Sequence, residues 1–140
     1  MDGFVLDPSV ALSWCFPGDP TENSPYSRAI LDHLEIADAI VPEIWPFEIA
    51  NGIFVAHNRR RRIIEADIQE FVRLLETLPI RVIRAEWLSN IALESLARKH
   101  DLAVYDVAYL DLAIRQGLPL ATSDQGLRKA ALAEGLALVE

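Results

Sequence analysis

Cysteine, long apolar runs and net positive charge are all scarce in this 140-residue sequence, and each scarcity excludes a class of protein. The single cysteine, Cys15, excludes an internal disulfide and a cysteine metal site, so we interpret it as a small buried hydrophobic residue. No apolar stretch approaches the roughly 20 residues that span a bilayer. The first residues, Met1-Asp2-Gly3, lack the positive region of a signal peptide. We therefore expect a cytoplasmic protein with no membrane partner.

The charge balance excludes a general nucleic-acid coat. The chain has 13 basic and 21 acidic residues, and its formal net charge of −8 opposes broad attraction to phosphates. Only one stretch has the opposite sign, the consecutive Arg59, Arg60, Arg61 and Arg62. We interpret it as a solvated helix end in preference to an RNA contact or a contact for the acidic residues of a partner protein. An acidic protein acts on RNA when it binds the strand locally, through metal ions.

What the sequence does contain is a regular alternation of short apolar runs and longer helical segments. The apolar runs lie at residues 4–6, 39–42, 80–83, 120–122 and 136–139. The segments with helical periodicity lie at residues 24–36, 44–58, 65–78, 87–100, 105–116 and 124–134. This alternation predicts one α/β domain over residues 1–140, a three-layer sandwich whose central, mainly parallel sheet of about five strands is flanked by helices. Ligands of such sheets bind outside the carboxyl ends of the strands.

Two aspartates follow strands of the predicted sheet. Asp7 ends the first strand and precedes a proline, and Asp124 follows the strand at residues 120–122 and begins a helix. Taken singly, Asp7 is typical of a turn and Asp124 is typical of a helix cap. Because the carboxyl ends of parallel strands meet at one edge, we expect the two carboxylates to lie at the same edge.

Glu48 is the one ionisable residue in an otherwise apolar helical segment. Between Ile44 and Ala56 the only other polar side chain is that of Asn51, which shares a helix face with Glu48 at a spacing of three residues. A glutamate in apolar surroundings is costly unless it is paired or binds a cation. We favour a functional site over a narrow solvent-facing stripe.

Asp106 and Asp111 lie on the same predicted helix and point in different directions. Asp106 shares a face with the apolar residues Leu110, Ala113 and Ile114. Asp111 lies on the opposite side with Arg115 four residues on, the spacing of an exposed ion pair. Capping of the helix start is the ordinary role of an acid such as Asp106. We nevertheless select Asp106 for the site and reject Asp111.

Four carboxylates at one place require a counter-charge. Two like charges 4 Å apart repel by about 4 kcal/mol at an effective dielectric constant near 20. Proton uptake or a divalent cation relieves this repulsion. Oxygen ligands without cysteine or paired histidine favour Mg²⁺ or Mn²⁺.

The ensemble of these residues resembles a known family, the PIN-domain ribonucleases, and within it the VapC-type toxins of bacterial toxin–antitoxin pairs. The resemblance covers almost the whole chain and depends on four segments in order: Val5-Leu6-Asp7-Pro8-Ser9, Trp45-Pro46-Phe47-Glu48-Ile49-Ala50-Asn51, Tyr105-Asp106-Val107-Ala108-Tyr109-Leu110 and Leu120-Ala121-Thr122-Ser123-Asp124. The family has an acid at each of the four positions chosen above.

The resemblance implies properties that composition and periodicity do not. It implies that Asp7, Glu48, Asp106 and Asp124 hold one or two Mg²⁺ or Mn²⁺ ions and cleave RNA to a 5′-phosphate through an activated water. The side chains of Ser9, Asn51 and Thr122 would support these ligands. It also implies a homodimer and a cognate VapB-type antitoxin that inserts an arginine among the carboxylates.

Other readings of the same acids fit less well. A phosphotransfer receiver domain requires a lysine after a late strand, but Lys99 and Lys129 lie in predicted helices. A haloacid-dehalogenase-type phosphatase requires a second aspartate two residues after Asp7, where this chain has Ser9. The remaining alternative is a catalytically inactive PIN-fold module that binds a protein, and the presence of all four acids argues against it.

Overall fold

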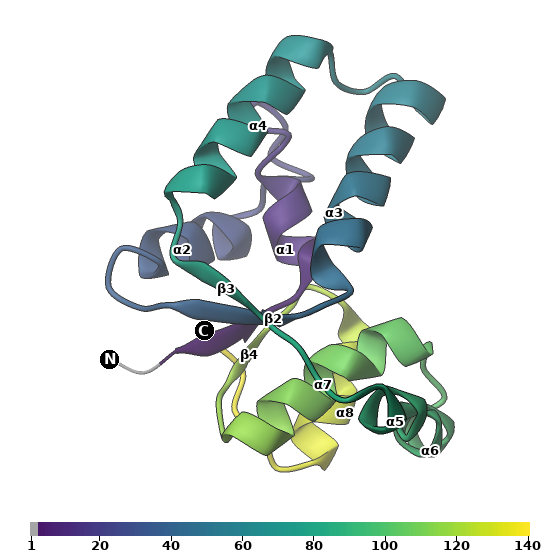
Figure 1. Cartoon of the computed structure of the whole chain (residues 1–140). Helices are drawn as coiled ribbons and strands as arrows, with labels where there is room; N and C mark the ends of the chain where they lie inside the picture. The colour runs from purple at the N-terminus through teal and green to yellow at the C-terminus, as the bar shows by residue number, and fades with distance from the viewer. Residues whose placement is uncertain (1–2) are drawn as a thin grey trace.

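A central parallel sheet separates two layers of helices in the computed structural model, which describes residues 3–140 (Figure 1). The strands are β1 (Phe4–Leu6), β2 (Ala39–Pro42), β3 (Ile80–Ile83) and β4 (Leu120–Ala121). They are ordered β3-β2-β1-β4, and every pair is parallel. The predicted three-layer α/β architecture is therefore confirmed.

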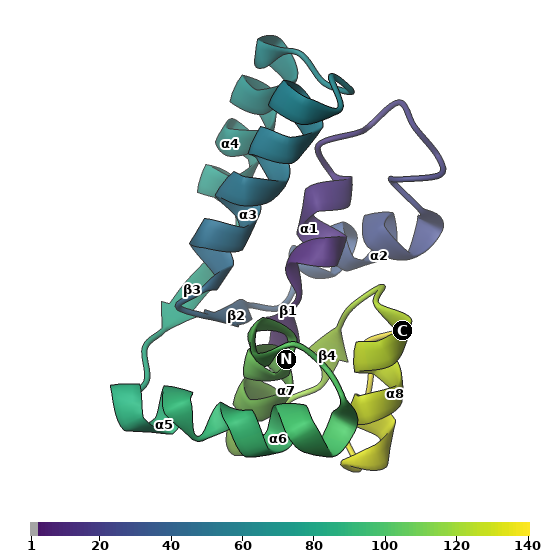
Figure 2. The same ribbon diagram turned by 90° about the vertical axis from the view of Figure 1, so that its right-hand side faces the viewer.

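The helices divide between the two faces of this sheet. They are α1 (Pro8–Ser13), α2 (Pro25–His33), α3 (Trp45–Phe54), the π-helical turn η1 (Val55–Arg59), α4 (Glu65–Thr77), α5 (Trp87–Ile91), α6 (Leu93–His100), α7 (Val104–Gln116) and α8 (Gln125–Ala133). Helices α1 to α4 cover one face, and α5 to α8 lie on the other (Figures 1 and 2). No helix of residues 3–140 is both long and apolar enough to cross a membrane.

The sheet has four strands where the sequence predicted about five. The C-terminal segment at 136–139 makes a single parallel bridge between Leu138 and Leu120 instead of a strand. Two backbone hydrogen bonds of 3.0 Å, from Leu120 N to Ala137 O and from Val139 N to Leu120 O, attach this segment beside β4. The segment therefore adds to the edge of the sheet without extending it by a full strand.

The strands at the centre of the sheet form the core. All three residues of β1 and both residues of β4 are fully buried, as expected for strands that are covered on both faces. Helix α1 packs so closely on α3 that a Cβ atom at Gly52 would lie 2.5 Å from the Leu12 side chain. This contact sets α1, which follows Asp7, directly against α3, which contains Glu48.

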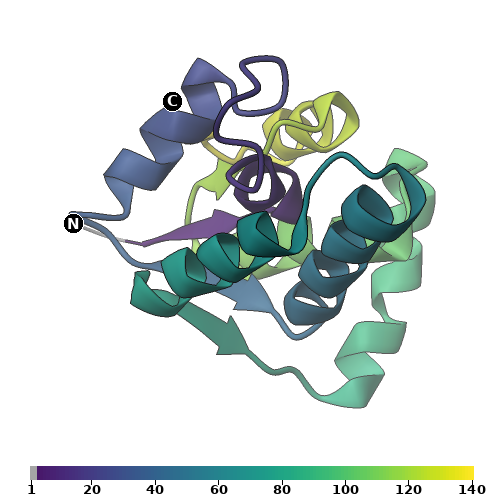
Figure 3. The same ribbon diagram turned by 90° about the horizontal axis from the view of Figure 1, so that it is seen from above.

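Helices α3 and α4 rise from the sheet as an antiparallel pair (Figures 1 and 3). The turn that joins them begins with η1 and includes Arg61, whose φ of 52° lies in the left-handed region. An extra residue per turn in η1 is shown by the 2.9 Å hydrogen bond from Arg60 N to Val55 O. Such wide turns recur at functional sites.

Candidate active site

Four carboxylates lie at the N-terminal ends of four different helices. Asp7 is the N-cap residue of α1 and Asp124 is the N-cap residue of α8. Glu48 lies in the first turn of α3, and Asp106 lies in the first turn of α7. The partial positive charge of a helix N-terminus stabilises a carboxylate. The fold therefore offsets part of the repulsion among these acids.

Asp7 is the most buried of the four acids. Its side chain is 5% exposed and accepts hydrogen bonds from the Ser9 hydroxyl, the Ser9 backbone N–H and, at 2.9 Å, the Thr122 hydroxyl. Burial raises the pKa of Asp7 to about 6, although these hydrogen bonds oppose the shift. The negative charge of Asp106 raises it further. Asp7 is thus held rigidly where its ionisation is costly.

Glu48 has a hydrogen-bond partner that the sequence analysis missed. The hydroxyl of Tyr109, on a fully buried side chain of α7, donates to Glu48 Oε1. Burial raises the pKa of Glu48, the Tyr109 hydrogen bond lowers it, and the charges of Asp7 and Asp106 raise it again. The sequence does show a tyrosine about one turn after Asp106, among apolar residues, which could have indicated a polar partner. That partner lies on α3, and sequence spacing does not reveal it.

Asp106 and Asp124 complete the group. Burial raises the pKa of Asp106, and the negative charge of Asp124 adds to the shift. The Asp106 carboxylate has no hydrogen bond to any of residues 3–140, whereas Asp124 Oδ1 accepts one of 2.9 Å from Leu127 N. Because like charges shift one another's pKa at short range, the four acids form one electrostatically connected set.

The three predicted supporting residues lie in two places. Ser9 and Thr122 both bond to Asp7, and the Ser9 hydroxyl also accepts a 3.1 Å hydrogen bond from Ser123 N. Asn51 is exposed and lines, with Glu48, a depression of about 400 Å³ between α1 and α3. Asp111, which was rejected for the site, accepts a 2.8 Å hydrogen bond from Arg115 Nε and forms the expected ion pair with it.

The donors fit a hard divalent cation by their chemistry, but their side chains do not form a closed coordination sphere. No three histidine, cysteine or acidic side chains of residues 3–140 are grouped closely enough to hold one ion as they lie. Glu48 is turned to Tyr109, and Asp124 is turned to its own helix. An all-carboxylate donor set nevertheless suits Mg²⁺ or Mn²⁺, which prefer oxygen ligands. At least one of them must turn for three to share an ion.

The Tyr109 hydroxyl is expected to act on ion binding through Glu48. Tyr109→Phe removes the donor that orients Glu48, and loss of such a partner weakens metal affinity by about 10- to 100-fold. Titration calorimetry with Mn²⁺ measures this change. Tyr26→Phe is the matched control, because the Tyr26 hydroxyl donates to the Val139 carbonyl at 2.7 Å and not to a carboxylate. Equal Mn²⁺ affinities in the two variants would contradict the role given to Tyr109.

Comparisons with known proteins agree with this arrangement. One solved structure, that of PAE2754 from Pyrobaculum aerophilum, is similar with a TM-score of 0.66 and 17% sequence identity, over 93% of this chain and 87% of that one. This likeness shows the fold. No curated protein matches the sequence significantly. The model of the PIN domain matches residues 4–132, a range that includes all four acids. PIN domains are generally metal-dependent nucleases, and because the match covers nearly the whole chain, we conclude that the chain belongs to the PIN domain family.

Proposed function

We propose that this protein is a metal-dependent endoribonuclease and the toxin of a toxin–antitoxin pair. The observation that carries the proposal is the convergence of Asp7, Glu48, Asp106 and Asp124 at four helix N-termini, with raised pKa values at the first three. Membership of the PIN family, with its general nuclease activity, supports it. RNA as the substrate and the pairing with an antitoxin come from the resemblance to VapC-type toxins.

Three of the four acids have separate parts in the proposed reaction. A Mg²⁺ or Mn²⁺ ion held by these acids would lower the pKa of the attacking water and stabilise the phosphate oxygens. Asp7, fixed by Ser9 and Thr122, supplies a rigid anionic oxygen at the carboxyl end of β1. The Asp106 carboxylate accepts no hydrogen bond from residues 3–140, so its oxygens are available to an ion or a water proton. Glu48 approaches from α3 and lines the depression between α1 and α3.

The proposal includes a homodimer in the cytoplasm. Helix α5 supports the dimer because Trp87, Leu88 and Ile91 are each more than 60% exposed on its surface. Large apolar side chains gathered on one short helix are typical of a surface that another protein covers. Sedimentation of the purified chain as a monomer would remove this part of the proposal.

The test of the nuclease is incubation of purified, antitoxin-free protein with total cellular RNA. We expect discrete fragments with Mn²⁺ or Mg²⁺ and none with EDTA, because the acids alone supply no positive charge. Asp106→Asn protein serves as the inactive control in the same experiment. Folded, inhibitor-free protein that yields no metal-dependent fragments would instead favour the inactive protein-binding module.

A further inference from the structure

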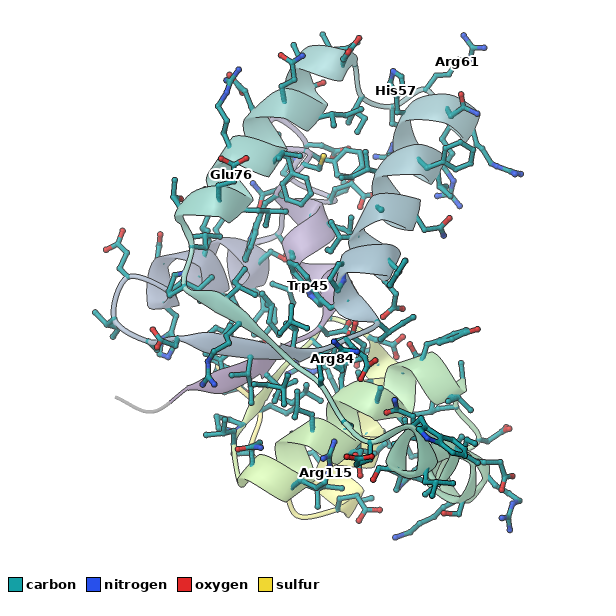
Figure 4. The ribbon with its side chains drawn as sticks, in the orientation of Figure 1. Trp45, His57, Arg61, Glu76, Arg84 and Arg115 are labelled. Carbon is teal, nitrogen blue, oxygen red and sulfur yellow. The ribbon has the colours of Figure 1, made fainter. Side chains whose placement is uncertain are left out.

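The end of the α3–α4 pair is the one strongly basic segment of an acidic chain. The residues between Glu48 and Glu65 include no acid, and they contain four consecutive arginines, Arg59–Arg62. Figure 4 shows Arg61 and His57 at the far end of the pair, pointing away from the sheet, whereas Trp45 lies at the base of α3. We call Arg59, Arg60 and Arg61 the arginine tip.

Arg62 is excluded from the arginine tip because its charge is already paired. It donates hydrogen bonds to Glu22 at 2.6 Å and Asp19 at 2.9 Å, and its guanidinium lies 4.8 Å from the centre of the Phe16 ring. These contacts attach the loop after α1 to the pair of helices. The role of Arg62 is therefore structural.

The three arginines of the tip have no acidic partner among residues 3–140. All three are exposed, and no salt bridge of the described chain includes them. Three adjacent unpaired cations repel one another, and an anionic ligand relieves this repulsion. Their partner is thus expected to be a polyanion.

A groove leads from the acids toward the arginine tip. One depression between α1 and α3, of about 400 Å³, is lined by Glu48, and the next, of about 360 Å³, is lined by Ser9 and Arg60. The two depressions share Leu12 and Gly52 in their walls, so they are adjacent along α3. At 1.5 Å per helical residue, the groove extends about 18 Å from Glu48 to Arg60. A single strand of a few nucleotides spans this distance.

An aromatic side chain beside the arginine tip favours nucleic acid over an acidic peptide. Phe54 is 47% exposed, and the Arg59 guanidinium lies 5.6 Å from the centre of its ring. Phe47, 72% exposed, lies two helical turns earlier on the same face of α3. Exposed aromatic rings next to cations are the surface on which single-stranded bases stack while their phosphates are neutralised.

We propose that Arg59, Arg60 and Arg61 bind the sugar–phosphate backbone of single-stranded RNA a few nucleotides from the bond that is cleaved. Phe54 lines neither depression, so a base stacks on it only where the strand has left the groove, beside Arg59. This inference rests on the proposed function, because it takes the strand in the groove to be the substrate of the four acids. The arginine tip would allow an acidic nuclease to bind a polyanion locally, although the net charge of the protein repels that polyanion.

The first experiment measures RNA binding as a function of salt. The triple variant R59Q/R60Q/R61Q is compared with R73Q/R81Q/K129Q, which removes three exposed charges elsewhere, both in the inactive D106N background. Fluorescence anisotropy with a labelled strand of about 16 nucleotides reports affinity. The slope of log affinity against log salt should become shallower by about 2 in the arginine-tip variant, since each single-strand phosphate contributes about 0.7. The control variant should keep its slope.

The second experiment separates the arginine tip from the acids by substrate length. With the acids intact, R59Q/R60Q/R61Q should lose most of its kcat/KM on the long strand and little on a dinucleotide, which does not reach the arginine tip. If the wild-type protein cleaves both substrates and the triple variant cleaves each of them as well as the wild type does, the arginine-tip proposal is overturned. The nuclease proposal then stands. Wild-type protein that cleaves no RNA with any metal would overturn the nuclease proposal, and the salt slopes would still decide the binding role.

Two glycine substitutions separate the effect of the Arg61 charge on RNA binding from an effect on folding. Arg61 and Asp101 have φ values of 52° and 53°, a left-handed conformation that glycine adopts without strain. Arg61→Gly and Asp101→Gly should therefore both raise the melting temperature, and only Arg61→Gly should weaken RNA binding. Arg61→Gly and the triple variant could instead keep the RNA affinity of the wild type and lose its binding of poly-glutamate. That result would show that the arginine tip binds an acidic protein, and it would overturn the proposal.

Discussion

Asp106→Asn protein should lose metal-dependent RNA cleavage by more than about 100-fold, a larger loss than that of residues which only support metal ligands. Asp111→Asn protein should retain most of its activity. Both substitutions remove one negative charge from α7, but the Asp111 carboxylate is paired with Arg115 on the outer surface. Asp106 shares the electrostatic environment of Asp7, Glu48 and Asp124. Initial cleavage rates at saturating Mn²⁺ measure the difference.

The stability of the same two variants provides an internal control for folding. Burial and the charge of Asp124 raise the pKa of Asp106, so the ionised Asp106 carboxylate destabilises the metal-free protein. Asp106→Asn should therefore melt at a higher temperature than wild type in EDTA, although it is inactive. Asp111→Asn loses an ion pair and should melt at the same or a slightly lower temperature. Similar activity losses in the two variants would refute the assignment of their helix faces.

The main elements of the fold were predictable because their local patterns agree with the tertiary structure. The four strands formed at the predicted apolar runs. Strands β1, β2 and β4 are continuously apolar because both of their faces are covered, whereas β3 lies at the edge of the sheet and includes the exposed Arg81. The segment at 44–58 is helical as predicted, although its last turn widens into η1. The segment at 87–100 is instead two helices, α5 and α6, with the break at Ala92, a residue that gives no local signal of a helix end.

Helix α1 was not predicted because the pair Asp7-Pro8 is typical both of the end of a strand and of the start of a helix. Pro8 was interpreted only as the residue that stops the first strand, but a proline is also favoured at the first position of a helix, and α1 begins at Pro8. Asp7 caps that helix by accepting a hydrogen bond from Ser9 N at 3.3 Å. The ordinary capping interpretation of Asp7 and its place among the acids are therefore both consistent with the geometry. The same holds for Asp124 at the start of α8.

Contacts between distant segments limited what the sequence predicted about the site. The inward face of α7 was assigned correctly at Leu110 but wrongly at Ile114, which is 40% exposed. Periodicity places a residue on a face within about one turn and does not specify how far the neighbouring layer extends. The Tyr109–Glu48 hydrogen bond joins residues 61 positions apart. Such a pair depends on how α3 and α7 cross near the carboxyl ends of the strands.

Metal-free protein should become less stable as the pH rises from 4 to 7, with Asp7 as the main cause. The pKa of Asp7 is raised from 3.8 to about 6, so between these values the folded chain binds more protons than the unfolded chain. The free energy of unfolding then falls with increasing pH, by about 3 kcal/mol from this group at 1.36 kcal/mol per pKa unit. Glu48 and Asp106 act in the same direction.

Asp7→Asn should remove most of this pH dependence and stabilise the metal-free protein at pH 7.5 by about 2 kcal/mol. The gain is smaller than the full linkage value, because an amide oxygen accepts the Ser9 and Thr122 hydrogen bonds less strongly than a carboxylate does. Urea unfolding of the wild-type and Asp7→Asn proteins at pH 5 and pH 7.5 in EDTA measures the free energies of unfolding. Asp19→Asn is the control, since hydrogen bonds from Thr21 lower the pKa of Asp19, and that carboxylate is ionised throughout this range.

A divalent ion should reverse the pH dependence of the wild-type protein only. Mg²⁺ or Mn²⁺ binds the ionised carboxylates and stabilises the folded chain by mass action, so the stabilisation should be larger at pH 7.5, where Asp7 has lost its proton, than at pH 5. Asp7→Asn should gain little at either pH. If wild-type protein instead became more stable between pH 5 and pH 7.5 in EDTA, ionised Asp7 would not be the source of strain. The unfavourable burial of one carboxylate at the end of β1 is thus expected to make the fold depend on the cation that its proposed chemistry requires.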